Sequence, residues 1–398
     1  MLSIQRQIRN TYPIHESNNV YLQKKVLFMG FQPGYKFSTE PDILWDGNTI
    51  RTGNYGFSGT HQSIVAMAEL MAAERYSVYV SFRTCRPNSI VNGVTYITDE
   101  MIPSIEKDVN ILIAPSWIDP TVGFQWRSLR KYVIWTHVKE QFPNEVLFKS
   151  FLMKYPACKI YLNTITNFVQ TFLDREYPYY KKYVYRPGNV HNPMLLDMIH
   201  PITQKTPESF IFHSSFERGG ALSCRVFDRL DLPQKTIEIC SYVPQDLELS
   251  EKYSISTKNK KEVFELLAKT EYFIYPGVSS KDYRLYKETD SLVVAECLLH
   301  EVIVLAFKVG ALYENYEDCV AWIPFPDETN LEYINHLCDT FHPELLSEKV
   351  VNSICKIIYD LEANPSKKEE LKKRGKELIE KQRNPKIIKE KFFKFLDI

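Results

Sequence analysis

The stretch Lys287–Glu314, KETDSLVVAECLLHEVIVLAFKVGALYE, decides the fold of this chain. Its apolar segment LVVAECLL at 292–299 predicts a helix, and VIVLAF at 302–307 predicts a buried parallel strand. Val309-Gly310-Ala311 then predicts a turn. A helix, a short apolar strand and a glycine turn in succession are typical of a parallel α/β sheet.

The start of this helix is also the strongest candidate for a functional site. Glu288 and Glu296 straddle it, and Asp290 and Ser291 are suitable N-caps. A helix start offers unpaired N–H groups and the positive end of a dipole, which suit a phosphate. Carboxylates accept hydrogen bonds from hydroxyls. The pattern therefore predicts a site for a phosphorylated sugar, and the alternative is a helix with two solvated glutamates.

Short apolar segments alternate with helical patterns through the first half of the chain. This alternation predicts a parallel sheet covered on both faces. The predicted strands lie at 25–31, 77–82, 94–97, 110–117 and 131–137, and the predicted helices at 59–76, 146–155 and 167–177. A polar loop is expected over 32–58.

The same alternation restarts after a Pro- and Asn-rich segment, 186–207, which we interpret as an interdomain hinge. We therefore expect an N-terminal domain over 1–195 and a C-terminal domain over 205–378. The Lys-rich segment 365–385 is interpreted as a helix with a solvated face. In the C-terminal half, strands are predicted at 209–215, 236–242, 271–277, 302–307 and 319–325, and helices at 263–270 and 292–299.

Composition excludes several classes of protein. With 398 residues, 49 basic and 49 acidic side chains and zero formal net charge, nothing favours nucleic acid as a partner. No segment reads as a signal peptide or a transmembrane segment. The cysteines show no metal-finger spacing, so we expect reduced, buried thiols and a cytoplasmic protein. They lie at positions 85, 158, 224, 240, 297, 319, 338 and 355.

The residues around the helix start resemble the donor-binding signature of retaining glycosyltransferases with the GT-B fold, chiefly those of family four. The places that match are Glu288, Glu296, Gly310, Ala311 and Glu314. The resemblance implies that Glu288 meets the hydroxyls of a donor sugar and that Glu296 meets the ribose. It also implies that the helix start binds the donor phosphates through Thr289, Asp290, Ser291 and Leu292.

One departure concerns the end of this helix. The family usually closes it with Ala-Gly, whereas this chain has His300-Glu301. The helix must therefore turn without glycine, which is the residue that most readily takes the left-handed conformation there.

A second element, HSSFERGG at 213–220, follows the first predicted strand of the C-terminal half. Small residues let a backbone approach a phosphate, and an arginine can pair with it bidentately. The element resembles an S-S-x-x-R-G sequence of these transferases, which implies that Arg218 binds the diphosphate beside Ser214, Ser215 and Gly219. Whether Arg225 or Lys287 supplies a second phosphate-binding cation stays open.

Two further elements lie in the N-terminal half. GFSGT at 56–60 resembles the glycine loop of the family, which implies that Gly59 approaches the donor phosphate or the acceptor. His137 ends a predicted strand and resembles the strand-end histidine that faces the donor sugar, with a structural role as the alternative. Asn189 and Asn192 are interpreted as hinge-loop residues.

The resemblance implies an α/β protein with the GT-B fold, in which the parallel sheets of two Rossmann-like domains face a cleft. It also implies that the final helix, at about 380–398, completes the N-terminal domain. The implied activity is retaining transfer from a UDP- or GDP-linked sugar to a glycan, lipid or protein acceptor, with neither metal nor cofactor. A lipid-linked acceptor would imply peripheral membrane association. The alternatives are a nucleotide-sugar epimerase-like enzyme on the same fold and an inactive sugar-binding protein, and the sequence does not indicate an oligomeric state.

Overall fold

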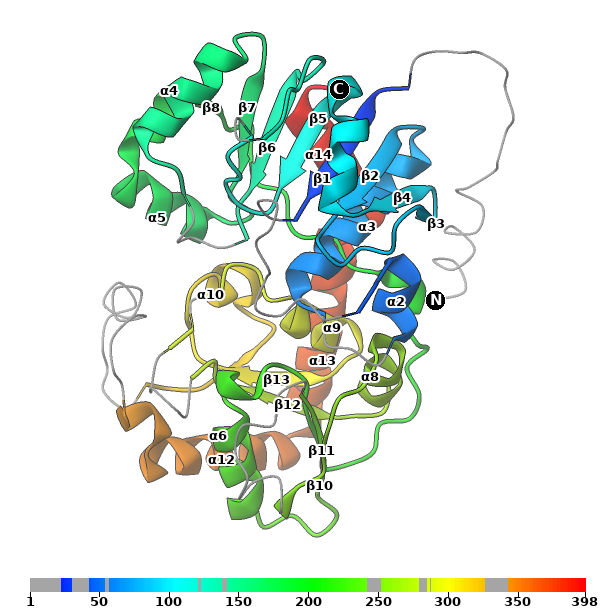
Figure 1. Ribbon diagram of the computed structural model, residues 1–398. Helices are drawn as coiled ribbons and strands as arrows, with labels where there is room; N and C mark the ends of the chain where they lie inside the picture. The colour runs from blue at the N-terminus through cyan, green and yellow to red at the C-terminus, as the bar shows by residue number, and fades with distance from the viewer. Residues whose placement is uncertain are drawn as a thin grey trace. The chain divides into compact units, whose positions relative to one another are not determined.

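The computed structural model divides into two compact units, whose elements are labelled in Figure 1. The N-terminal unit holds the described residues of 1–51, 57–197 and 385–398, and the C-terminal unit holds those of 52–56 and 198–384. The residues that the structure describes are 23–30, 43–53, 57–120, 123–137, 142–241, 252–278, 285–286, 288–325 and 343–398.

Within its described residues, the N-terminal unit contains an eight-stranded sheet in the order β3-β4-β2-β1-β5-β6-β7-β8. Neighbouring strands are parallel except β3 and β4. The strands are β1 (Lys25–Met29), β2 (Ser77–Ser81), β3 (Ser89–Val91), β4 (Val94–Ile97), β5 (Val109–Ala114), β6 (Lys131–Trp135), β7 (Lys159–Asn163) and β8 (Val184–Tyr185).

Helices cover both faces of this sheet, because strand side chains alternate between the faces. On one face, Leu112 and Ile134 belong to a core that also contains Phe148 of α4 and Leu173 of α5. On the other face, Trp135 lies 6.1 Å from Phe392 of α14, measured between ring centroids. The helices are α2 (Gly47–Thr52), α3 (Gly59–Ala73), α4 (Glu145–Lys154), α5 (Asn167–Glu176) and α14 (Pro385–Leu396).

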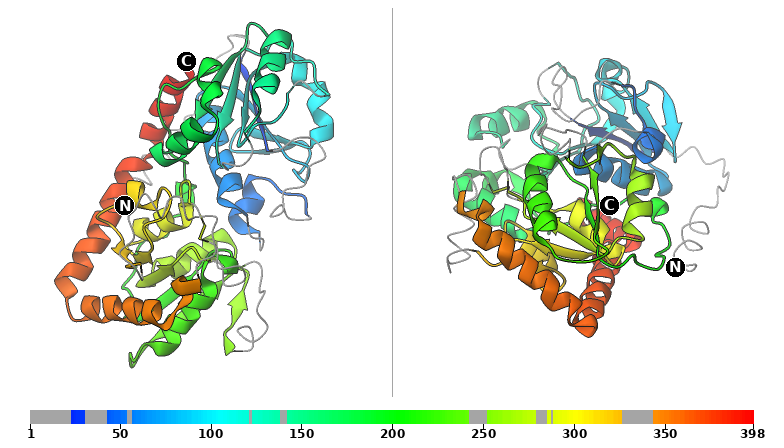
Figure 2. Two further views of the ribbon diagram at one scale, coloured as in Figure 1. Left: turned by 90° about the vertical axis from the view of Figure 1, so that its left-hand side faces the viewer. Right: turned by 90° about the horizontal axis from the view of Figure 1, so that it is seen from below.

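The C-terminal unit contains a parallel sheet in the order β11-β10-β9-β12-β13-β14. Its strands are β9 (Ser209–Phe212), β10 (Thr236–Cys240), β11 (Ile255–Ser256), β12 (Tyr272–Tyr275), β13 (Ile303–Ala306) and β14 (Ala321–Trp322). Helix α13 packs against α9, and α12 packs against α6; both α12 and α13 are orange in Figure 2. The helices are α6 (Gly220–Arg229), α8 (Lys260–Leu267), α9 (Leu292–Leu299), α10 (Leu312–Tyr316), α12 (Glu348–Glu362) and α13 (Pro365–Gln382).

The prediction of two Rossmann-like domains with parallel sheets is confirmed, and the predicted strands and helices are found within a few residues of their expected ends. The sequence did not predict the strands β3, β7, β8 and β11 or the helices α2, α6 and α10. β7 has the sequence KIYLN, in which only the lysine is exposed, and α6 has the sequence GALSCRVFDR, with Leu222 and Val226 among its buried residues. α2 lies inside the expected loop 32–58. Contacts with residues outside the helix stabilise it, because Arg51 pairs with Glu69 and Asp197 at 2.7 Å each.

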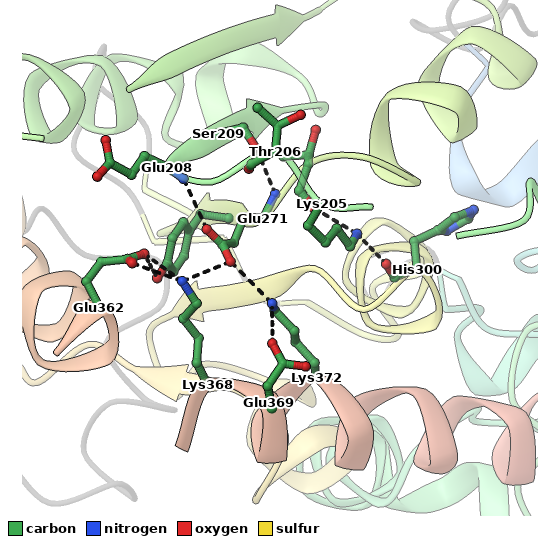
Figure 3. Close-up of polar contacts among 12 residues, drawn as sticks. Lys205, Thr206, Glu208, Ser209, Glu271, His300, Glu362, Lys368, Glu369 and Lys372 are labelled. Carbon is green, nitrogen blue, oxygen red and sulfur yellow. Dashed lines mark hydrogen bonds and ion pairs between the residues drawn. The ribbon is translucent and has the colours of Figure 1, made fainter. Parts of the chain in front are cut away.

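The interpretation of the Lys-rich helix α13 as a solvated face is wrong for two of its lysines. The side chains of Lys368 and Lys372 are only 12% and 7% exposed, and both pair with the buried carboxylate of Glu271, at 2.9 and 3.2 Å (Figure 3). Lys368 also pairs with Glu362, and Lys372 with Glu369. Since a buried charge must be compensated, this network fixes α13 to the amino-terminal edge of β12.

The interdomain connector is tied to the same part of the C-terminal unit. The ammonium group of Lys205 donates to the carbonyl oxygens of Leu267 and Thr270, at 2.8 Å each. It also donates to the carbonyl oxygen of His300 at 2.6 Å (Figure 3). These carbonyls lie at the carboxyl ends of α8 and α9, where a cation is favoured by both helix dipoles. The end of the expected hinge segment is therefore fixed to the C-terminal unit by hydrogen bonds.

Helix α9 ends in a turn that contains no glycine. Glu301 takes a φ of 58°, so a non-glycine residue occupies the left-handed position. Glu301 N–H donates to Leu298 and Val302 N–H donates to Cys297, which is the Schellman arrangement. An ion pair between Glu301 and Lys376 at 2.6 Å accompanies this turn.

The described cysteines are buried and free, as expected, and Cys338 lies outside the described residues. Within the described ranges, no helix combines the length and the apolar character needed to cross a membrane.

The first testable consequence concerns Glu271. Glu271→Gln leaves two buried lysines without their shared carboxylate, so we expect the free energy of unfolding to fall by about 3 kcal/mol. Burial alone would raise the pKa of Glu271, but Lys368 and Lys372 outweigh it and the pKa lies below its ordinary value. Glu271 thus stabilises the fold above the pKa of an unfolded glutamate, and this contribution is lost as the pH falls.

Urea unfolding at several pH values measures both effects. The matched control is Glu369→Gln, because the Glu369 side chain is 69% exposed and that variant should unfold like the wild type. Equal stability of the two variants would show that Glu271 does not anchor α13.

Candidate functional site

The strand order of the C-terminal unit places a candidate site at one edge of its sheet. From β9 the chain continues to β10 on one side and later to β12 on the other side. In open α/β sheets, ligands bind outside the carboxyl ends of the strands where the order reverses in this way. Arg218 follows β9 and Glu288 follows β12 along the chain. Both are residues that the sequence predicts for the functional site.

The loop after β9 approaches the end of β12 unusually closely. Residues Phe216–Arg218 form the short 3-10 helix η5, and Gly219 follows with a φ of 115°, which favours glycine. A Cβ atom at Gly219 would lie 2.6 Å from Cγ of Pro276, directly after β12. Glycine is therefore required at position 219 for both its backbone angle and the packing of the two loops.

Arg218 and Glu288 meet at this point. Nη1 of Arg218 lies 2.5 Å from Oε1 of Glu288, whose side chain is 8% exposed, whereas that of Arg218 is 40% exposed. The Tyr275 hydroxyl donates to the same carboxylate oxygen at 2.5 Å. Burial and the Glu288 charge raise the pKa of Tyr275, so its proton is retained. The guanidinium of Arg218 also lies over the ring of Tyr286, 5.2 Å from the centroid.

The backbone of Glu288 is held by the turn 309–311. Ala311 N–H donates to the carbonyl oxygen of Glu288 at 2.8 Å. Gly310 has a φ of 55°, and a Cβ atom there would lie 2.4 Å from that oxygen and 2.8 Å from the nitrogen of Glu288. The predicted glycine turn therefore serves to position Glu288.

The start of α9 differs from the expectation in one respect. Ser291 is the N-cap residue, but its side chain makes no capping bond, and its buried Oγ has no hydrogen-bond partner among the described residues. Asp290 does not cap the helix either. Its carboxylate pairs with Arg383, at 2.8 Å for the Oδ2–Nη1 contact, and both side chains are fully buried. The prediction of Ser291 as the N-cap residue is confirmed, but its side chain makes no capping bond. The carboxylate of Asp290 is paired with a distant arginine instead.

The first turn of α9 consequently lacks a side-chain cap, with Leu292 as its first residue and Thr289 shortly before it. Helix α6, which the sequence did not indicate, also starts without a side-chain cap, directly after Gly219. Two helix N-termini thus begin beside the pair of Arg218 and Glu288. Ser214 and Ser215 are half-buried in the loop that leads to α6, and the carbonyl of Ser215 accepts from Arg218 N–H at 2.9 Å.

Glu296 lies further along α9 and is 2% exposed. Its Oε1 pairs with the ammonium of Lys260 at 2.5 Å. Burial raises the pKa of Glu296, and the charge of Lys260 opposes that rise. Sequence spacing gave no signal for Lys260, because it lies on another helix.

Of the two candidates for a second phosphate-binding cation, Arg225 alone lies within the described residues. Arg225 pairs with Glu348 at 2.6 Å and also donates to the carbonyl of Leu346. Lys287 lies outside the described residues. Glu314 is exposed on α10.

The N-terminal unit has a similar polar edge. Its strand order reverses between β1 and β5, and α3 begins at Gly59 after the N-cap Ser58. Ser58 Oγ lies 2.7 Å from Nδ1 of His61. Burial and the nearby His137 lower the pKa of His61 to about 3, so its ring is neutral. The structure therefore brings the loop of Gly59 and the strand-end His137 together, and it adds His61.

Further polar groups lie at the same edge. His137 N–H donates to the carbonyl of Pro115 at 2.9 Å, which joins the segments that follow β6 and β5. The buried hydroxyls of Ser116 and Thr136 have no hydrogen-bond partner in the part of the chain that the structure describes. Such groups usually bind water or a ligand. By contrast, Asn189 bonds to Thr164 and Asn167 within the N-terminal unit, and Asn192 is buried.

Comparison with solved structures identifies the fold. Sucrose-phosphate synthase from Thermosynechococcus elongatus superposes with a TM-score of 0.60 and 13% identity, covering 94% of this chain and 98% of that one. A glycosyltransferase from Rickettsia africae gives 0.59 and 10%, covering 94% and 99%. Anabaena HepE in complex with UDP-glucose gives 0.58 and 11%, also covering 94% and 99%.

These structures are glycosyltransferases with the GT-B fold, and the chain has that fold along nearly its whole length. The predicted fold is thereby confirmed. No protein-family model matches the sequence, and neither does any curated protein.

The second testable consequence concerns Gly310. Gly310→Ala forces a left-handed alanine and a clash with the Glu288 backbone, so we expect the free energy of unfolding to fall by about 3 kcal/mol. Gly277→Ala is the matched control, because Gly277 has a φ of 66° and nothing lies within 4 Å of the point that a Cβ atom would occupy there. It should cost only about 1 kcal/mol. Thermal unfolding of both variants would contradict the close approach if the two losses were equal.

Proposed function

We propose that the protein is a glycosyltransferase that moves a sugar from a UDP- or GDP-linked donor to a glycan, lipid-linked or protein acceptor, with retention at the anomeric carbon. The observation that carries the proposal is the pairing of Arg218 with Glu288 beside two uncapped helix starts, at the switch point of a GT-B donor domain. The described residues hold no group of three or more His, Cys, Asp or Glu side chains suited to a metal ion.

The pair supplies two complementary functions. Glu288 is an acceptor of hydrogen bonds, which suits sugar hydroxyls, and Tyr275 fixes the orientation of its carboxylate. Arg218 is partly exposed and presents a planar cation, which suits a diphosphate. The charges of Arg218 and Glu288 neutralise each other in this ion pair. A bound nucleotide sugar would exchange this contact for one contact with the diphosphate and one with the sugar.

Departure of the nucleoside diphosphate requires stabilisation of the negative charge that develops on it. Arg218 and the N-termini of α6 and α9 are fixed donors and dipoles of the required sign. Groups that need no reorganisation when the bond breaks are the most effective. We infer that this charge stabilisation proceeds without a metal ion, and that the polar edge around His137 and Gly59 serves the acceptor or the donor sugar.

The proposal predicts donor turnover that depends on Glu288 and Arg218. The purified protein is incubated with UDP- and GDP-linked sugars, and release of the nucleoside diphosphate to water or to an added acceptor is measured. Arg218→Met should lower the turnover number by about 100-fold or more, as expected for the loss of a preorganised charge at the leaving group. Glu288→Gln should lower turnover similarly, since the amide cannot accept as strongly from sugar hydroxyls.

The control is Glu377→Gln on α13, whose side chain is 62% exposed and which should leave turnover unchanged. Proton NMR of the product reports the anomeric configuration, and inversion would overturn retention. Tight binding of nucleotide sugars without turnover would indicate a sugar-binding protein, and release of an altered free donor would indicate an epimerase.

A further inference from the structure

The ion pair between Glu296 and Lys260 is more deeply buried than the ion pair between Arg218 and Glu288. The Glu296 side chain is 2% exposed and that of Lys260 is 11% exposed, with 2.5 Å between Oε1 and Nζ. The second carboxylate oxygen, Oε2, is buried and has no hydrogen-bond partner among the residues that the structure describes. Burying a carboxylate with one oxygen unsatisfied is costly, so the arrangement indicates a ligand for Oε2.

The pair lies at the ligand-binding edge of the C-terminal sheet. Lys260 is the first residue of α8, which follows the carboxyl end of β11. The pKa of His213, immediately after β9, is lowered first by burial and next by the charge of Lys260. His213 in turn opens the loop that contains Arg218. Two strand ends and the start of α8 thus place Lys260 on the same edge as Arg218.

The Lys260 side chain has a fixed course. Its ammonium lies 5.0 Å from the ring centroid of Phe264, one turn along α8, and the ring thereby adds a cation–π contact. Helix α8 is itself fixed by a capping box in which Asn259 and Glu262 exchange bonds with each other's backbone N–H groups. The cation is therefore presented to Glu296 from a rigid element.

We propose that Lys260 is a positioning residue for the nucleoside of the donor: it orients the Glu296 carboxylate so that Oε2 accepts hydrogen bonds from the vicinal hydroxyls of a ribose. This inference rests on the proposed function, because it assigns the nucleoside part of the same donor site. It makes Lys260 responsible for discrimination between a ribonucleotide and a 2′-deoxyribonucleotide, a role that no sequence motif indicates.

The electrostatic surroundings explain why this cation is needed. Burial raises the pKa of Glu296, and the groups that oppose the rise are Lys260 and, more weakly, Arg383. His213 and His300 also face this region, but burial lowers the pKa of both and leaves them neutral. Without Lys260 the carboxyl would be protonated at a higher pH, and a protonated carboxyl is a weaker acceptor for hydroxyl groups.

Calorimetric titration of the full-length protein with UDP, GDP and ADP, and with the 2′-deoxy form of each, tests the inference. The wild type should prefer the ribonucleotide about tenfold or more, as expected for hydroxyls that donate to a charged acceptor. Lys260→Met, which keeps the stem over Phe264, should reduce this preference to near one and leave the 2′-deoxynucleotide affinity little changed. Lys260→Arg should restore most of the preference.

The matched control is Lys261→Met, since Lys261 is the next residue, is 59% exposed and pairs only weakly with Glu265 at 4.0 Å. It should bind like the wild type. The pH profile separates positioning from a general structural role. Affinity of Lys260→Met for the ribonucleotide should fall more steeply than that of the wild type as the pH is lowered, because loss of the Lys260 charge raises the pKa of Glu296 further.

Should Lys260→Met not fold, the double variant Lys260→Met/Glu296→Gln removes both charges and avoids an unpaired buried ion. It should lack both the ribose preference and the pH dependence. Retention of the preference in either variant overturns the inference, while nucleotide binding itself leaves the proposed function intact. Absence of binding by any nucleoside diphosphate to the wild type overturns the proposed function and this inference together.

Discussion

The ion pair between Arg218 and Glu288 is the interaction around which the C-terminal unit is arranged. It joins the loops that follow two neighbouring central strands, β9 and β12, and it requires those loops to approach each other to within van der Waals contact. Gly219 and Gly310 make this approach possible, because a Cβ atom at either position would overlap Pro276 or the backbone of Glu288. The close packing of backbone thus determines where the charges lie.

Buried charges then fix the helices that carry the site. Asp290 and Arg383 pair with both side chains fully buried, so the segment before α9 is fastened to the end of α13. Glu271 fastens the other part of α13 to the opposite edge of the sheet through Lys368 and Lys372. A buried ion pair is a poor source of net stability, but removal of one partner is severely penalised. Such pairs therefore impose a particular arrangement on α9 and α13 at little net gain in stability.

The chemistry of the candidate site depends on the helix N-termini that this arrangement leaves without a side-chain cap. The carboxylate of Asp290 pairs with Arg383, and the Ser291 side chain makes no capping hydrogen bond. The N-terminus of α9 therefore begins without a side-chain acceptor in the described structure. The N-terminus of α6 is likewise uncapped. In the proposed reaction, two helix dipoles and one arginine supply positive charge to the departing diphosphate. Fixed dipoles of this kind can replace a mobile counter-ion.

The sequence alone determined the repeating pattern of strand and helix, and hence the two parallel sheets, because hydrophobic periodicity is a local property. Its resemblance to a known family implied the GT-B fold. The sequence also singled out Arg218, Glu288 and Gly310, which lie in short segments with distinctive residue types. Only the tertiary structure decided the partners of Asp290 and Glu296, namely Arg383 and Lys260, since those pairs join residues 93 and 36 positions apart. It also decided that lysines of a highly charged helix are buried. Ion pairs of long sequence separation leave no periodic trace in a single sequence, so they become visible only when the chain has folded.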